Sequence, residues 1–364
     1  MSNKGNKNVV LIVCDCLRSD CAYNEKIMPF LSNLRKRKDF YYNKNSYTNA
    51  PGTYFAMPTM LTGYMPFEKT NQAGIDKYNS DQFLPRLYKK IGFTTIGITA
   101  NLVTSRAFGF DRFWDTFIDL WKARKKAIKK KLRADKIFKS LQTIKLNREN
   151  NLIFLHFIDP HSPYIPNNLV AKQKSEAMKL FIKLTKNKTC LTLKDIENMK
   201  LLYKEECKYL DRYLKLTISY LEMKLKWDKT KLVITADHGE AFYETNYLQH
   251  ERDHIDNLHH INTPLITKNI KLSKKTYWTT DIYNMLLPDT LPKVKSHQVC
   301  IGYKKVFDSV ADIKDRLKNP KIKQKYIPYI KNDLKNIKII KNIKQLQYKC
   351  QKNYILKYKS YINT

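Results

Sequence analysis

Acidic and histidine side chains follow three apolar segments of the sequence. Asp15 comes directly after the first segment, Asp159 and His161 come after a later one, and Asp237 and His238 come after a third. Carboxylate and imidazole groups are common ligands of divalent metal ions. Each of these residues alone is more often a turn or helix-capping residue. Their shared position, just after an apolar segment, indicates a metal site if the segments lie side by side.

The segments that precede these residues have the composition of strands buried on both faces of a parallel sheet. They are continuous runs of apolar and β-branched residues at 8–14, 152–157 and 231–236. Further strands are expected at 93–100 and 264–267, and helices at 27–34, 54–61, 82–90, 122–139 and 193–225, of which the one at 122–139 is strongly basic. Strands that alternate with helices predict a doubly wound α/β sheet. Ligands bind beyond the carboxyl ends of the strands in such sheets, so the acidic and histidine side chains should meet at one edge.

Longer motifs surround these residues and follow one another along the chain. They are an opening strand with Asp15 and Arg18, a segment at 46–66 that contains Thr53 and Leu61-Thr62-Gly63, a strand followed by Asn101, a glycine-phenylalanine-aspartate stretch at 108–115, Asp159-Pro-His161-Ser-Pro-Tyr164, a helical segment at 202–211, Asp237-His238-Gly239-Glu240, His250, and Asp281. In order and spacing they resemble the sulfatase family of the alkaline phosphatase superfamily. The resemblance covers roughly residues 8–287. It implies an alkaline-phosphatase-like α/β/α sandwich with a mostly parallel central sheet.

The resemblance also implies a divalent cation beside a reactive hydroxyl. Asp15, Asp237 and His238 correspond to metal ligands, and Thr53 takes the position of the nucleophile, where it also contacts the metal. A hydroxyl at a helix N-terminus lies beside backbone N–H groups that can bind the anionic oxygens of an ester. A metal lowers the pKa of such a hydroxyl. The alternative for Thr53 is a simple helix N-cap.

Further residues contact the substrate if the resemblance holds. His161 and His250 would contact the anion or protonate the leaving group. Arg18, Asn101 and His254 would bind the substrate. The alternative for each histidine is a hydrogen-bonded structural role.

Two departures from the family pattern bear on the reaction. Most sulfatases convert a Cys or Ser at the nucleophile position into formylglycine, which Thr53 cannot form, and Phe55 and Met57 stand where the family has Pro and Arg. Threonine at this position resembles instead the phosphodiesterases and the phosphoethanolamine and phosphoglycerol transferases. Cys16 replaces a second aspartate and so removes an oxygen ligand. Zinc or manganese is therefore favoured, with calcium or magnesium as alternatives.

The sequence predicts a metal-dependent hydrolase that acts on sulfate or phosphate esters through Thr53. One alternative is a phosphoethanolamine- or phosphoglycerol-type transferase, and another is a catalytically weak relative that binds polyanions. The intact set of Asp15, Thr53, Asp237 and His238 favours an enzyme. The expected substrate is an anionic ester, for which a glycan and a lipid headgroup are candidates.

The charge balance of the 364-residue chain is strongly basic. It has 68 Lys and Arg against 33 Asp and Glu, which gives a formal net charge of +35. Such a surplus suits a polyanionic partner, but Lys, Asn, Ile and Tyr also accumulate when codons are AT-rich. No recognised nucleic-acid-binding motif is present, so no specific nucleic acid partner is expected. The seven cysteines form no CxxC pair and are expected to be reduced thiols.

The chain divides by composition into two parts. Residues 1–301 are expected to form the catalytic domain, and residues 302–364 a Lys-rich, helical appendage. A basic amphipathic helix at 331–347 could bind an anionic surface. The N-terminus lacks the pattern of a signal peptide, and no segment approaches the roughly 20 apolar residues of a membrane span. These features predict a cytoplasmic protein.

Overall fold

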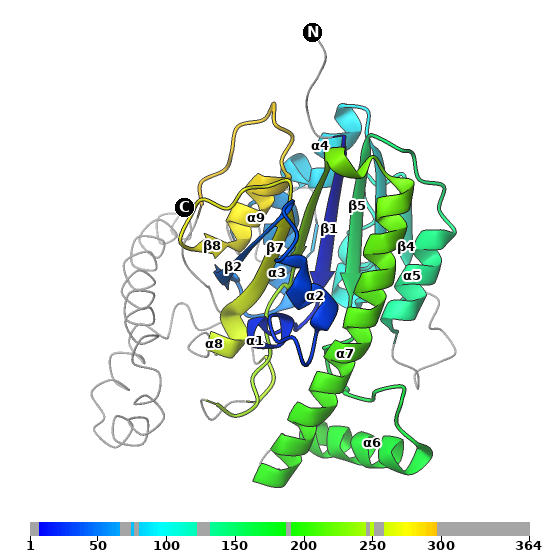
Figure 1. Ribbon diagram of the computed structural model, residues 1–364, viewed down its shortest axis with the longest axis vertical. Coiled ribbons are helices and arrows are strands. Elements are labelled where there is room, and N and C mark those ends of the chain that lie inside the picture. The colour runs from blue at the N-terminus through cyan, green and yellow to red at the C-terminus, as the bar shows by residue number, and fades with distance from the viewer. Residues whose placement is uncertain are drawn as a thin grey trace, which may run out of the picture.

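A mixed β-sheet runs through the computed structural model of the protein (Figure 1). The structure describes residues 7–65, 74–75, 80–121, 132–186, 191–244, 248–250 and 258–296. Within these residues the sheet has eight strands in the order β4-β3-β5-β1-β6-β7-β2-β8. The expected appendage at 302–364, including the helix at 331–347, lies outside the described residues.

Five neighbouring strands of the sheet run parallel to one another. They are β4 (Thr116–Asp119), β3 (Thr94–Thr99), β5 (Asn151–Phe157), β1 (Asn8–Cys14) and β6 (Thr230–Thr235). The strand β7 (Asn262–Lys268) is antiparallel to both β6 and β2 (Phe40–Tyr47), and β8 (Tyr277–Trp278) pairs in parallel with β2. The predicted mostly parallel sheet is therefore confirmed.

The strand β1 lies in the middle of this parallel block and is buried along its whole length. Its alternate side chains pack into two separate apolar cores, one on each face of the sheet. The register pairs Val13 with His156 of β5 and with Thr235 of β6. The chain segments that follow β1, β5 and β6 therefore leave the sheet at the same edge.

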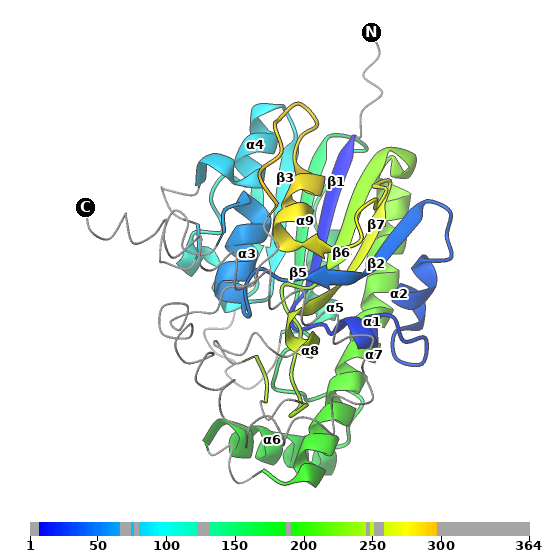
Figure 2. The same ribbon diagram turned by 90° about the vertical axis from the view of Figure 1, so that its left-hand side faces the viewer.

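Helices cover both faces of the sheet (Figure 2). One face packs against α2 (Pro29–Leu34), α5 (Ala134–Gln142) and α7 (Leu193–Lys224), and the other against α3 (Thr53–Thr62), α4 (Leu84–Lys90) and α9 (Thr279–Leu286). The short helix α1 (Ser19–Ala22) follows β1, and α8 (Leu258–Ile261) precedes β7. The layers form the expected α/β/α sandwich. None of the described helices has the length and apolar composition needed to cross a membrane.

The helix α7 continues well past the edge of the sheet, where α6 (Ala171–Lys186) packs against it (Figure 1). It begins with a capping box in which the Thr192 hydroxyl accepts the Asp195 N–H (3.2 Å) and the Asp195 carboxylate accepts the Thr192 N–H (2.8 Å). Where α7 passes the sheet edge, the buried Tyr203 hydroxyl donates to the carbonyl of Cys16 at 2.8 Å. The long helix therefore braces the turn that follows β1.

Most of the elements predicted from hydrophobic patterns are present in the structure. Every predicted strand, and the predicted helices at 27–34, 54–61, 82–90 and 193–225, coincide with an element within a few residues. Of the helix predicted at 122–139, the part from 134 onward lies in α5, and residues 122–131 lie outside the described residues. Several other elements have no counterpart in the sequence-based predictions, namely the strands β2, β4 and β8 and the helices α1, α6, α8 and α9. The strand β2 has the sequence FYYNKNSY, whose Asn and Lys residues are poor strand formers, so its pairing with β7 and β8 determines its conformation.

Candidate metal and nucleophile site

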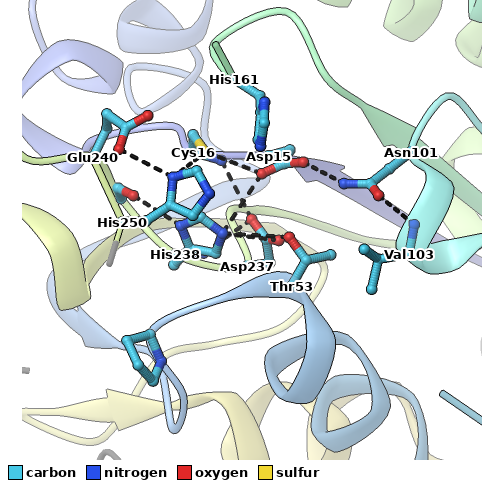
Figure 3. Close-up of polar contacts among 12 residues, drawn as sticks. Asp15, Cys16, Thr53, Asn101, Val103, His161, Asp237, His238, Glu240 and His250 are labelled. Atoms are coloured by element: carbon cyan, nitrogen blue, oxygen red, sulfur yellow. Dashed lines mark hydrogen bonds and ion pairs between the residues drawn. The ribbon is translucent and has the colours of Figure 1, made fainter. Parts of the chain in front are cut away.

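The four residues predicted to hold the metal converge at the edge where β1 and β6 end (Figure 3). Asp15 follows β1, Asp237 and His238 follow β6, and Thr53 is the first residue of α3. All four side chains are buried. His238 Nε2 lies 3.3 Å from Thr53 Oγ1, 3.7 Å from Asp15 Oδ1 and 3.6 Å from Asp237 Oδ2.

Hydrogen bonds to the backbone fix two of these side chains, Asp237 and His238. In each of them one atom that could bind a metal then faces the other residues of the site. Asp237 Oδ1 accepts the backbone N–H groups of Cys16 (3.3 Å) and His238 (2.9 Å), and Oδ2 has no hydrogen-bond partner among the described residues. His238 Nδ1 donates to the Gly239 carbonyl at 2.8 Å, which puts the lone pair of the neutral ring on Nε2. A buried carboxylate oxygen without a donor is costly. A divalent ion between these atoms removes that cost, so the residues fit a metal.

The Asp15 carboxylate is also oriented by its neighbours. Asn101 Nδ2 donates to Asp15 Oδ2 at 2.5 Å, and Asn101 Oδ1 in turn accepts the Val103 N–H at 2.6 Å. The Cys16 thiol contacts Asp15 Oδ1 at 3.2 Å. Partners of this kind fix the direction in which a ligand points. Asn101, predicted to bind substrate, therefore supports a metal ligand in this structure.

Charged groups of the site shift one another's pKa values. Burial disfavours the ionised form of Asp15, but nearby His161 and His238 outweigh it and lower the pKa of Asp15 to about 2. Burial likewise disfavours a charged His238, but Asp237 and Asp15 outweigh it and raise the pKa of His238 above its ordinary value. The site therefore attracts positive charge, which a divalent cation can supply in place of a proton.

The start of α3 presents the Thr53 hydroxyl to His238. The residue in the N-cap position is Gly52, and Thr53 is the first helical residue. The simple N-cap interpretation of Thr53 is therefore wrong. The preceding carbonyl, that of Pro51, accepts a hydrogen bond from His260 Nε2 at 2.8 Å. Burial, together with His238, lowers the pKa of His260 to about 3, so His260 is a neutral donor that holds this loop.

The turn after β6 approaches the chain before β7 closely. The Gly239 N–H donates to the His260 carbonyl at 2.7 Å. A Cβ atom at Gly239 would collide with the carbonyl oxygen of His259, so only glycine fits without a backbone shift. This close approach explains the glycine after the Asp-His pair.

Two further histidines lie beside His238 (Figure 3). The ring centroid of His250 is 4.6 Å from that of His238 and 4.9 Å from that of His161. His250 Nδ1 lies 3.1 Å from Glu240 Oε1, and Glu240 Oε2 accepts the Tyr164 hydroxyl at 2.6 Å. Burial disfavours ionised Glu240, but His250 outweighs it and lowers the pKa of Glu240 to about 2. A buried carboxylate thus orients the His250 ring.

A cavity of about 380 Å³ opens onto this group of residues. Its polar lining includes Thr53, Asn101, His161 and His250. Its apolar lining includes Tyr54, Leu102, Val103, Trp121, Leu132 and Ile158. The volume and mixed lining are those of a small-molecule site.

One residue predicted to bind substrate, Arg18, does not line this cavity. Arg18 is buried and donates to Asp20 (2.6 Å) and to Glu244 (2.7 Å). His254 lies outside the described residues. Substrate binding by Arg18 and His254 therefore stays a prediction.

The loop that carries His161 is anchored by a buried ion pair that no sequence motif had indicated. Arg133 donates from Nη1 to Glu206 Oε2 (2.6 Å) and from Nη2 to Glu206 Oε1 (3.1 Å). Glu206 Oε1 also accepts the Ile165 N–H at 2.8 Å, and Arg133 donates to the Ile165 carbonyl. Helices α5 and α7 therefore clamp the segment that follows β5.

Replacing Glu206 by alanine is expected to lower the free energy of unfolding by about 3–5 kcal/mol, because Arg133 stays buried with only the more distant carboxylate of Asp159, at 4.0 Å, to balance its charge. The matched control is Glu205→Ala on the same helix. Glu205 is partly exposed and pairs with Lys208 at 2.6 Å, so its loss should cost less than about 1 kcal/mol. Chemical denaturation of both variants measures the difference. Similar small losses for the two variants would refute the anchoring role.

The family assignment follows from comparison with known proteins. The family model described as Sulfatase matches residues 7–285, well over half of the chain. This chain is a member of the sulfatase family. The matched range contains Asp15, Thr53, Asp237 and His238, the four residues that converge in the structure. No curated protein matches the chain.

Solved structures confirm the fold of this sulfatase-family chain. The C-terminal periplasmic domain of EptC from Escherichia coli, in complex with Zn, superposes with a TM-score of 0.56 at 17% identity, over 77% of this chain and 81% of that one. A protein in the alkaline phosphatase superfamily from Vibrio parahaemolyticus gives 0.51 at 16%, over 77% and 65%. The soluble domain of lipooligosaccharide phosphoethanolamine transferase A from Neisseria meningitidis gives 0.53 at 14%, over 78% and 88%.

Proposed function

We propose that this sulfatase-family chain is a divalent-metal-dependent enzyme that cleaves phosphate or sulfate esters with Thr53 as nucleophile. The observation that carries the proposal is the position of Thr53 Oγ1, 3.3 Å from His238 Nε2 and on the wall of the cavity. A buried hydroxyl inside a set of two carboxylates and an imidazole has the surroundings of an activated nucleophile.

The side chains that converge at the sheet edge would hold a divalent ion beside the nucleophile. Asp15, Asp237, His238 and Thr53 would hold the ion, whose charge lowers the pKa of the hydroxyl and offsets the negative charge of the transferred group. Zinc or manganese suits a set that includes an imidazole nitrogen. The Zn complex of the EptC domain supports a zinc ion here as well.

The remaining steps use the side chains around the cavity. The Thr53 hydroxyl first loses its proton to solvent. Its deprotonated oxygen then attacks phosphorus or sulfur as the bond from that atom to the leaving oxygen breaks, and it is deprotonated again when hydrolysis frees it. The leaving oxygen takes a proton from a histidine on the cavity wall, for which His250 is well placed because Glu240, 3.1 Å from its Nδ1, orients the ring. Water then attacks the Thr53 ester, gives a proton to the now neutral histidine, and releases the Thr53 oxygen.

The purified protein is expected to turn over phosphate esters faster than sulfate esters, because Thr53 cannot form the formylglycine that most sulfatases use. A panel of an aryl phosphate monoester, an aryl phosphate diester and an aryl sulfate, with zinc or manganese added, tests this directly. Robust turnover of the aryl sulfate with none of either phosphoester would contradict the prediction. Turnover of none of the three would favour the catalytically weak, polyanion-binding alternative.

A transferase is the second candidate function. It is supported by the fold shared with the phosphoethanolamine transferase domain and by the apolar part of the cavity wall, which suits a lipid or other apolar acceptor. Glycerol or a longer alcohol added to the reaction distinguishes the two functions. A transferase would need the alcohol for repeated turnover and would yield the phosphorylated alcohol, whereas a hydrolase would turn over repeatedly without the alcohol and release free phosphate.

A further inference from the structure

We propose that His156 is an additional nitrogen ligand of the divalent ion, and this proposal rests on the metal site of the proposed function. His156 belongs to β5 and stands opposite Val13 of β1 and Thr99 of β3 in the sheet. Its side chain is fully buried. One ring nitrogen of His156 and one carboxylate oxygen each of Asp15 and Asp237 all lie within 4.8 Å of one another.

The hydrogen bond on the far side of the ring leaves one nitrogen for the metal. His156 Nδ1 lies 2.8 Å from the Thr104 hydroxyl, which lies 2.5 Å from the Thr99 hydroxyl. The Thr99 oxygen also accepts the Asn101 N–H at 3.1 Å. If His156 Nδ1 donates its hydrogen bond to the Thr104 hydroxyl, the Thr104 hydroxyl can in turn donate to the Thr99 hydroxyl. Each donor of this chain then has an acceptor. The lone pair of the ring is then on Nε2.

His156 Nε2 has no hydrogen-bond partner among the described residues, although it is completely buried. The same holds for Asp237 Oδ2. Two buried acceptor atoms in one site, neither of which receives a hydrogen bond, lower the stability of the folded protein. The opposite tautomer does not remove the cost, because its Nε2 proton would also be buried without an acceptor. A single cation between His156 and Asp237 satisfies both atoms at once.

The Thr104 hydroxyl is the outer partner that an imidazole ligand needs. Metal-bound histidines commonly donate their second N–H to a fixed acceptor, which sets the tautomer and the direction of the ring. With His156 the set becomes two carboxylates, two imidazoles and the Thr53 hydroxyl. A second nitrogen favours zinc, cobalt or copper and disfavours calcium, which prefers oxygen ligands.

Copper(II) is a probe for counting the imidazoles. We expect the electron paramagnetic resonance spectrum of the Cu²⁺-loaded full-length protein to show nitrogen couplings from at least two imidazoles, and His156→Gln to lose one of them. His156→Gln should also weaken Zn²⁺ binding by more than roughly 10-fold. Thr104→Val should keep the imidazole count of the unmodified protein but weaken Zn²⁺ binding, because it removes only the outer partner.

A double variant keeps the test decisive even if His156→Gln does not fold. Replacing both cavity histidines, His161 and His250, by glutamine leaves His238 and His156 as the expected imidazole ligands. Two coupled imidazoles in this variant would support the proposal. One imidazole would overturn it while leaving the metal site of the proposed function intact. Failure of the unmodified protein to bind Cu²⁺ or Zn²⁺ would overturn both.

Discussion

Replacing Thr53 by alanine is expected to reduce ester turnover by at least roughly 10³-fold while the fold is retained. Only the hydroxyl oxygen can form the covalent ester, and loss of a nucleophile removes most of the catalysis. The N-cap of α3 is Gly52, so the substitution removes no side-chain cap. Steady-state rates and melting temperatures of the purified variant measure the two effects separately.

Two other substitutions test whether the effect belongs to the Thr53 hydroxyl. Thr53→Ser should retain measurable turnover, because the oxygen survives and only a methyl group is lost. Thr59→Val is the matched control on the same helix, because Thr59 is buried and its hydroxyl has no hydrogen-bond partner in the described part of the chain. It should react at a near-normal rate. A near-normal rate for Thr53→Ala would remove the nucleophile assignment.

Removal of the metal is expected to abolish turnover, and zinc or manganese should restore it. The protein as purified should contain about one ion for each chain, because Asp15, Asp237, His238 and Thr53 already provide a four-coordinate set. Chelation should also lower the melting temperature, because an ion that binds only the folded state stabilises that state. Elemental analysis and melting curves before and after chelation measure both effects.

Asp237→Asn is expected to weaken zinc binding by more than roughly 100-fold. The substitution removes a charge that faces Asp15 and His238 across the site. The control is Asp211→Asn, which removes a buried carboxylate that accepts the N–H groups of Phe30 and Leu31 at the start of α2. That variant should lose stability but keep its metal. If the Asp237→Asn variant kept its full metal content, the assignment of Asp237 as a metal ligand would be wrong.

The predictable part of the fold consists of elements whose signal is local. The strands β1, β5 and β6 are continuous apolar runs, and α7 repeats apolar residues at helical spacing over 32 residues. The strand β2 has no such run, because its residues 41–45 are all at least partly exposed and include Asn and Lys. It forms because β7 and β8 offer backbone partners on both of its sides, and those partners lie more than 200 residues away in the chain.

The site was predictable to a similar extent. Asp15, Asp237 and His238 could be identified because each follows a buried strand, and Thr53 could be identified through the sulfatase resemblance. The supporting residues Glu240 and Tyr164 stand in the same motifs, but their bond to each other and to His250 is visible only in three dimensions. His156 looks like an ordinary strand residue in the sequence, because nothing in its neighbourhood along the chain reveals a missing hydrogen-bond partner.

The order of amino acids is enough to predict which segments become buried strands, that polar side chains follow them, and that a hydroxyl residue replaces the usual nucleophile. Which atoms face one another depends on contacts between segments that are distant in the chain. The direction of a carboxylate or imidazole depends on hydrogen bonds from distant segments, such as those from Asn101 to Asp15 and between Thr104 and His156. Those partners are brought together by the order of strands in the sheet, and strand order depends on packing over the whole domain.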